Sequence, residues 1–281
     1  MVFVNNVDGE AVDVNIITGG SGDVPFNLQV NQGKYPTYSA VDKFGENPQI
    51  DKVTVPEDVW EYGGLYTYDT NGTAPIISLV STSTSDTMDV EVTGLDIDGY
   101  EVKQTITLTG TTRVALTTAL WRVYRVANVG TADTVGTVYC YTLTGNTPSA
   151  ASIRAMIDNG NNQTLMALYT VPRGKVGFLY RGEMGGSRKR NAGAAQCSYY
   201  SRRFGKVFRV KKRISVVNSG SSTYQDSRSF PDIIPALTDI KLTVEDVSDD
   251  DTGVFGTFDI LLIDESDFST AYLQAIGQPY V

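Results

Sequence analysis

The stretch from Met88 to Gly110 alternates apolar and polar residues on both sides of an Asp-Gly pair. In "MDVEV" the side chains of Met88, Val90 and Val92 fall on one face of an extended chain. The alternation resumes in "VKQTITLTG", after Asp98-Gly99, which is a strong signal for a tight turn. We therefore predict a β-hairpin in which each strand buries one face.

Other runs rich in β-branched and aromatic residues predict further strands. These runs are Ile76–Ser81, Ala119–Val129, Thr134–Leu143, "KVGFLY", "KVFRVKK", "TDIKLTVEDV" and "VFGTFDILLID". Turn-rich breaks separate them at short intervals, and a Pro172-Arg173-Gly174 turn precedes "KVGFLY". This pattern predicts an all-β fold of antiparallel β-sandwich or jelly-roll-like domains. One short helix is expected over Thr147–Gly160, with Ser149 as its N-cap.

The chain divides into three expected parts. Residues 1–59 are Gly-rich and polar with scattered apolar stretches, which is typical of an extended N-terminal arm ordered by contacts. Residues 60–145 are expected to form one β-sandwich domain and residues 146–281 a second. A single larger sandwich is the alternative.

The composition excludes several kinds of catalytic site. The chain has no histidine, which removes imidazole bases, Ser-His-Asp and Cys-His catalysis and histidine-containing zinc sites. Its two cysteines, Cys140 and Cys197, are far apart, and we expect both to be free and buried. We therefore expect no cofactor and no enzymatic activity. A carboxylate-based hydrolase remains an alternative, since acidic residues are numerous.

The acidic stretch Glu245–Asp251 has two interpretations. Its carboxylates could hold Ca²⁺, or they could be the solvated end of a hairpin. EF-hand spacing is absent, and we favour the hairpin end.

Basic residues gather in one part of an otherwise acidic chain. The net charge is −9, yet eleven of the 23 Lys and Arg residues lie between Arg181 and Arg213, where Glu183 is the single acidic residue. Such a segment can bind a phosphate backbone or an acidic protein surface. Because the rest of the chain is acidic, we favour a protein partner, including a second copy, over nucleic acid. The predicted interaction face comprises Arg188, Lys189, Arg190, Arg202, Arg203, Lys206, Arg209, Lys211 and Arg213. On "KVFRVKK", Phe208 and Val210 are expected to face the core.

No stretch is long and apolar enough for a membrane span, and the first residues lack the basic and apolar regions of a signal peptide. Folding in the cytosol, with no membrane partner, is therefore expected.

Several segments together resemble structural proteins of tailed bacteriophages, particularly those in marine viral sequences. They are "VEVTGLDIDGYEVKQTITLTGTTRVALTTALWRVYRV", "LMALYTVPRGKVGFL", "GKVFRVKKRI" and "IIPALTDIKLTVE…FDILLID". The resemblance extends from about Trp60 to Asp264. It implies a virion protein assembled in the host cytoplasm, with no catalytic residues to carry over.

From the resemblance and the composition we expect a capsid decoration protein. Its partners would be the major capsid protein or other virion proteins, and it would form a homo-oligomer, a trimer being one option. A tail, head–tail connector or fibre component that binds a glycan is the alternative, followed by a virion hydrolase and a DNA-contacting internal protein.

Overall fold

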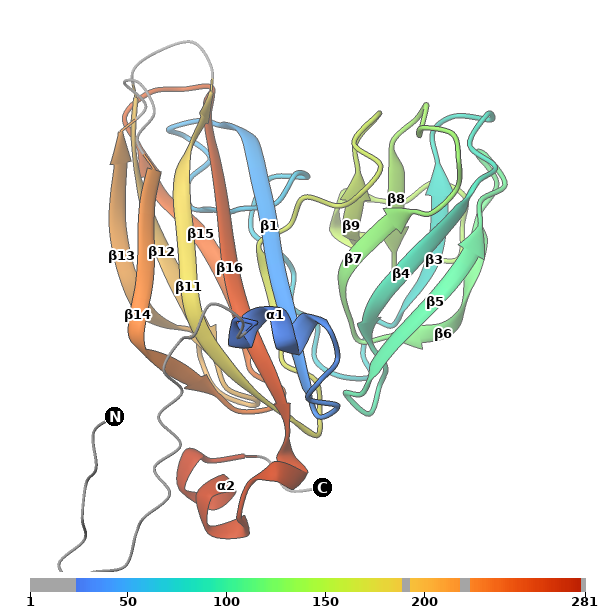
Figure 1. The fold of residues 1–281 in the computed structure, drawn as a ribbon. Coiled ribbons are helices and arrows are strands. Elements are labelled where there is room, and N and C mark those ends of the chain that lie inside the picture. Colours follow the sequence, from blue (N-terminus) through green and yellow to red (C-terminus); the bar gives the residue numbers. More distant parts are fainter. Residues whose placement is uncertain (1–23, 189–192, 218–222, 279–281) are drawn as a thin grey trace, which may run out of the picture. The chain divides into compact units, whose positions relative to one another are not determined.

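The computed structural model describes residues 24–188, 193–217 and 223–278 (Figure 1). The chain separates into two units. The first unit comprises Met1–Pro36, and its described part contains helix α1 (Phe26–Asn31). The chain leaves α1 at Gly33, whose positive φ of 71° suits a residue without a Cβ. The rings of Phe26 and Tyr35 pack together at 5.4 Å.

The second unit, Thr37–Val281, is built from antiparallel strands, which confirms the all-β, sandwich-like prediction. Two of its sheets form the first sandwich. One has the order β6 (Val114–Leu120), β3 (Ile76–Ser81), β8 (Val138–Tyr141) and β9 (Ile153–Ile157). The other has the order β5 (Glu101–Thr107), β4 (Asp89–Leu95) and β7 (Arg122–Asn128). Both sheets bury their apolar residues in one core cluster.

The other two sheets form the second sandwich. One has the order β1 (Tyr38–Ile50), β16 (Thr252–Asp264), β11 (Lys175–Arg188) and β14 (Thr223–Ile234). The other has the order β10 (Leu168–Thr170), β15 (Asp239–Val247), β12 (Ala194–Arg202) and β13 (Arg209–Val217), and β2 (Glu57–Asp58) pairs with β15. A 3₁₀ turn, η2 (Glu265–Asp267), and helix α2 (Thr270–Ile276) follow β16. Ser269 is the N-cap of α2, and its side chain accepts a hydrogen bond from the N–H of Tyr272.

The predicted hairpin is confirmed. Strands β4 and β5 pair from Asp89 opposite Thr107 to Leu95 opposite Glu101, and Gly99 takes a φ of 84° in the turn. Val90 and Val92 are fully buried, as the alternation requires.

Strands β15 and β16 also follow their sequence pattern. Ile240, Leu242 and Val244 of β15 are buried, and so are Phe258, Ile260 and Leu262 of β16. The two strands lie in different sheets of the second sandwich, so these six side chains meet in its core. Burial of such apolar surface is the main source of its stability.

The predicted helix over Thr147–Gly160 is wrong. A 3₁₀ turn, η1 (Ala150–Ser152), leads directly into β9, which pairs with β8. Ile153, Ala155 and Ile157 are buried at every second position, which is the period of a strand. The residue between the first two, Arg154, is buried in an ion pair that the sequence alone could not show. Because β9 belongs to the first sandwich, that sandwich extends past the expected boundary at residue 145.

The expected irregular arm also contains regular structure. Strand β1 pairs with β16 along its length, as the neighbouring blue and red strands of Figure 1 show, and so belongs to the second sandwich. Its inward positions include Lys43, Gly45 and Asn47, so the hydrophobic alternation that marks a strand is missing. Residues 1–23 of the expected arm lie outside the described part of the chain.

The expected strand Ala119–Val129 is two strands. The chain leaves β6 at Leu120, passes Trp121 and continues as β7, which belongs to the opposite sheet of the same sandwich. Trp121, which connects two strands of the first sandwich, packs into the core cluster of the second sandwich. It therefore contributes a hydrophobic contact between the two sandwiches.

Gly45 marks a very close approach of two segments. A Cβ at this position would lie 2.1 Å from the backbone nitrogen of Ala167 and 2.6 Å from the carbonyl oxygen of Val59. The N–H of Ala167 in turn donates to the carbonyl of Val59. Only glycine therefore fits between these backbones.

Candidate interaction surface

The nine residues of the predicted interaction face do not all share one environment. Five of them are exposed on or next to β13: Arg203, Lys206, Arg209, Lys211 and Arg213. We call these five residues the basic edge, because β13 is the last strand of its sheet. No ion pair joins them to any other residue in the described part of the chain. Arg188 is the last residue of β11, and Lys189 and Arg190 lie outside the described residues.

A β-bulge sets the direction of the side chains on β13. Tyr199 pairs with Lys212 and Tyr200 pairs with Val210, so Lys211 is the extra residue. Arg209, Val210 and Lys211 are consequently all exposed. The expectation that Val210 faces the core is therefore wrong, because the bulge interrupts the two-residue period on which that prediction rested.

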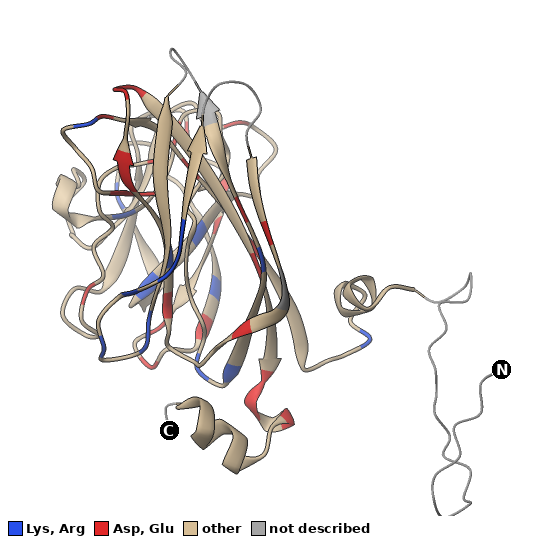
Figure 2. Ribbon diagram, turned by 90° about the vertical axis from the view of Figure 1, so that its left-hand side faces the viewer, with Lys and Arg blue, Asp and Glu red and all other residues tan. Residues whose placement is uncertain are grey.

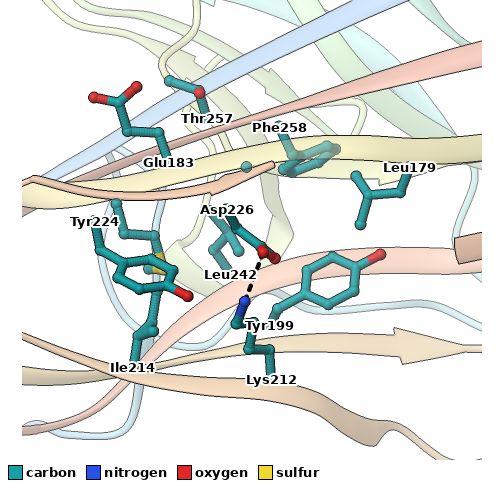
Figure 3. A pocket seen from close by; sticks show the side chains of 12 residues that line it. Leu179, Glu183, Tyr199, Lys212, Ile214, Tyr224, Asp226, Leu242, Thr257 and Phe258 are labelled. Carbon is teal, nitrogen blue, oxygen red and sulfur yellow. Dashed lines mark ion pairs between the residues drawn. The ribbon is translucent and has the colours of Figure 1, made fainter. Parts of the chain in front are cut away.

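Beyond the bulge, Lys212 points into the second sandwich. Its ammonium lies 2.6 Å from the carboxylate of Asp226 and 5.1 Å from the ring centre of Tyr224, and Figure 3 shows the ion pair among the apolar side chains. Burial acts to lower the pKa of Lys212, but the hydrogen bonds to Asp226 and Tyr224 outweigh it and raise the pKa. The cavity beside the pair is about 30 Å³, which is enough for about one water molecule. It is too small for an organic ligand.

Arg202 also turns inward, away from the basic edge. Its guanidinium lies 2.5 Å from Asp239 and within 5 Å of the ring centres of Tyr68 (4.9 Å) and Phe208 (4.5 Å). Asp239 also accepts from Arg122 at 3.1 Å and from the hydroxyl of Thr170 at 2.7 Å. Arg202 thus belongs to an internal network in which one buried carboxylate serves two guanidinium groups.

Two more buried ion pairs accompany this network. Asp58 accepts from the ammonium of Lys241 at 2.7 Å, and Asp69 accepts from Arg154 at 2.6 Å. Figure 2 shows that charged residues, blue and red, occur on strands as well as on turns. The sequence pattern did not predict these interior charges. A usable signal existed for Arg122, a cation in the middle of the apolar run "ALWRVYRV".

A pocket of about 200 Å³ adjoins the Arg202–Asp239 pair. Aromatic and charged side chains line it together, among them Tyr68, Trp121, Phe204, Arg122 and Asp239. Asn71 also lines it, and its side-chain oxygen is buried without a hydrogen-bond donor. This mixture of ring faces, donors and acceptors suits a small polar ligand.

A second pocket, of about 320 Å³, lies beside Lys43. The ammonium of Lys43 donates to the carbonyl of Tyr124, which is the extra residue of a bulge in β7. Burial, helped by the positive charge of Arg125, lowers the pKa of Lys43 to about 7. Lys43 thus supplies the hydrogen bond that the irregular strand leaves open.

The acidic turn between β15 and β16 is held by hydrogen bonds. Asp250 accepts from the N–H of Lys52 at 2.9 Å, and Asp251 accepts from the side chain of Gln49 at 2.8 Å. Within the described residues, no three acidic or cysteine side chains gather in a way that could hold a metal ion. Cation binding at this turn stays untested, and the observed role of the carboxylates is to fasten the turn to the end of β1.

Cys140 and Cys197 are both buried and free. Burial raises the pKa of each thiol to about 12, so neither is a reactive thiolate at neutral pH. Of the helices in the described ranges, none is long and apolar enough to cross a membrane.

No protein-family model matches the sequence, and no curated protein matches it. Among solved structures, the VP2 subviral particle of infectious bursal disease virus aligns with 88% of this chain and 79% of its own, at 11% identity and a TM-score of 0.24. A structure of the Gt strain of that virus aligns with 87% and 79%, at 11% identity and a TM-score of 0.22. The PBSX exported protein XepA aligns with 92% and 98%, at 10% identity and a TM-score of 0.18. At such low scores the likeness is remote, and the residues of this chain carry the functional argument.

Proposed function

We propose that this chain is a non-enzymatic structural protein of a bacteriophage virion, and that within the particle it decorates and stabilises the capsid. The observation that carries the adhesive role is the basic edge, five exposed cations in a chain of net charge −9. The resemblance of the segments between Trp60 and Asp264 to phage structural proteins supports the assignment to a virion.

The basic edge would dock on acidic side chains of a neighbouring subunit. Opposite charges that meet across an interface speed association and reject wrong partners. Stable attachment also needs a buried area on the order of 1,000 Å² or more, so the contact has to extend beyond these five side chains. The neighbour would be a second copy of this chain or the major capsid protein. Nucleic acid is the less favoured partner, and no cofactor is required.

Quantitative mass spectrometry of purified particles tests this function. A decoration protein should be present in a copy number comparable to that of the major capsid protein. A handful of copies per particle would instead indicate a tail or connector component. Absence from particles would overturn the virion assignment.

The second candidate is a tail, connector or fibre protein that binds a glycan. The pocket of about 200 Å³ favours it, because aromatic rings beside Arg and Asp side chains are suited to a sugar ring and its hydroxyls. Phe204 is half exposed at this pocket, so Phe204→Ala should weaken glycan binding without loss of fold. Failure of the unmodified protein to bind any glycan on an array of host envelope sugars would remove this candidate.

A further inference from the structure

Lys241 and Asp58 form an unusually enclosed pair of reactive side chains. The pairing of β2 with β15 sets Asp58 opposite Thr243, two residues beyond Lys241 and on the same face of the sheet. The ammonium nitrogen of Lys241 lies 2.7 Å from one carboxylate oxygen of Asp58 and 3.0 Å from the other. Asp58 is fully buried, and Lys241 is 9% exposed. This double contact holds the Lys241 nitrogen against the Asp58 carboxyl group, which supplies the proximity that an attack on the carboxyl carbon requires.

The pair lies in a buried site that aromatic rings border. The Lys241 nitrogen lies 5.0 Å from the ring centre of Phe208 and 5.7 Å from that of Tyr200. Burial raises the pKa of Asp58, against the opposing effect of Lys241. Direct transfer of one proton along the 2.7 Å contact would turn the two charges into a neutral pair, which costs less to bury. The transfer produces a neutral amine, which is a nucleophile, and a carboxylic acid, which can be attacked.

Each carboxyl oxygen of Asp58 also has its own hydrogen-bond donor. The N–H of Tyr66 donates to Oδ2 at 2.8 Å, and the hydroxyl of Thr243 donates to Oδ1 at 2.6 Å. A fixed backbone N–H at Oδ2 would stabilise negative charge that develops there when the carbon is attacked. The Thr243 hydroxyl would assist departure of Oδ1.

We propose that Lys241 and Asp58 condense to an intramolecular isopeptide bond. The Lys241 nitrogen attacks the Asp58 carboxyl carbon, and the tetrahedral intermediate holds its negative charge on Oδ2. Oδ1 then leaves as water and carries away two protons of the ammonium. The N–C bond forms and the C–Oδ1 bond breaks, with no change in oxidation state and no further reactant. The product joins β2 covalently to β15 across a separation of 183 residues.

Denaturing mass spectrometry of the purified full-length chain tests the bond. The expected mass is lower than that of the sequence by one water molecule, about 18 Da, after allowance for any removal of Met1. A protease digest should contain a branched peptide that joins the segments around Asp58 and Lys241, and trypsin should no longer cleave after Lys241. Even a partial fraction of this species supports the proposal. The full sequence mass, with both peptides free, overturns it.

Variants locate the bond and identify its chemistry. Lys241→Arg keeps the positive charge but removes the nucleophilic amine, so its mass should equal that of its own sequence. Asp58→Asn should lose ammonia in place of water and reach the same final mass as the wild-type chain. Thr243→Val should slow the reaction and leave a larger uncrosslinked fraction.

Other ion pairs in the same digest serve as internal controls. Lys103 lies 2.9 Å from Glu91, and Lys212 lies 2.6 Å from Asp226, but both lysines are more exposed than Lys241. No branched peptide is expected from either pair. Because the wild-type mass is decisive by itself, a variant that fails to fold leaves the test intact.

Discussion

Arg202 and Asp239 form an ion pair at 2.5 Å inside the chain, although Arg202 belongs to the basic run that the sequence presents as an exposed face. The side chain of Asp239 is 5% exposed and also contacts Arg122, whose side chain is 5% exposed as well. The basic run therefore has two roles in the structure. Arg202 and Lys212 neutralise the carboxylates of Asp239 and Asp226, and the five residues of the basic edge stay exposed.

Asp239→Asn should strongly destabilise the fold. The change leaves the guanidinium groups of Arg122 and Arg202 without their shared negative charge, and breaking a buried pair in this way costs about 3–5 kcal/mol. The free energy of unfolding from urea denaturation measures the effect. Asp246→Asn, which removes a charge from an exposed position of the same strand, should change it by less than about 0.5 kcal/mol. If Asp239→Asn lowered the free energy of unfolding no more than Asp246→Asn does, the network around Asp239 would contribute little to stability.

Reversing charge on the basic edge should prevent assembly but leave the fold intact. Arg209 and Lys211 are exposed, so replacing both by Glu should cost little stability. The free energy of unfolding of Arg209→Glu/Lys211→Glu should lie within about 1 kcal/mol of that of the wild-type chain. In sedimentation experiments the variant should form a smaller assembly than the wild-type chain does. Its binding to capsids should also be lost. The control is Lys34→Glu/Lys52→Glu, with the same change of net charge at two exposed lysines elsewhere. Unchanged assembly of the first variant would contradict the proposed role of the edge. Salt-dependent DNA binding that disappears in this variant would instead identify a nucleic-acid partner.

Glu61 should make stability depend on pH. Burial raises its pKa from 4.5 to about 7, against hydrogen bonds from Asp158 and Asn161. The folded chain therefore binds a proton at Glu61 more tightly than the unfolded chain does. The resulting stability is fully present below pH 4.5 and is lost as the pH rises through about 7. In Glu61→Gln, this decrease should be absent when unfolding is measured across that range. Parallel pH profiles of the two proteins would contradict the prediction.

Gly45→Ala should destabilise the second sandwich by about 3 kcal/mol, because backbone atoms rather than flexible side chains occupy the space for the new methyl group. Thermal unfolding measures the change. Gly145→Ala is the matched control, since no heavy atom lies within 4 Å of its Cβ position. A tolerated Gly45→Ala would mean that β1 does not pass this close to Ala167.

Much of the fold was predictable where burial follows a simple period. Val90, Val92, Ile240, Leu242 and Phe258 are all inward because a strand that buries one face must alternate. The same rule failed for β1, whose inward positions hold Lys43, Gly45 and Asn47. In this strand, Gly45 lies against the backbone of Ala167 and Lys43 donates to the carbonyl of Tyr124, in place of hydrophobic contacts. Both partners are distant in sequence.

The candidate surface was predictable as a region but not residue by residue. The cluster of positive charge is a property of composition, so the sequence reveals it. The direction of each side chain depends on the bulge at Lys211, which reorients Lys212, and on Asp239, which draws in Arg202.

By itself, the sequence determined that this chain forms antiparallel strands and that it lacks histidine chemistry. Both conclusions depend only on local alternation and on residue counts. The tertiary structure alone decided that β1 belongs to a sheet, that β9 is a strand, and that Asp58 meets Lys241. These outcomes depend on contacts between residues far apart in the chain, and the free energy of burying a charge depends on the partner that folding brings to it.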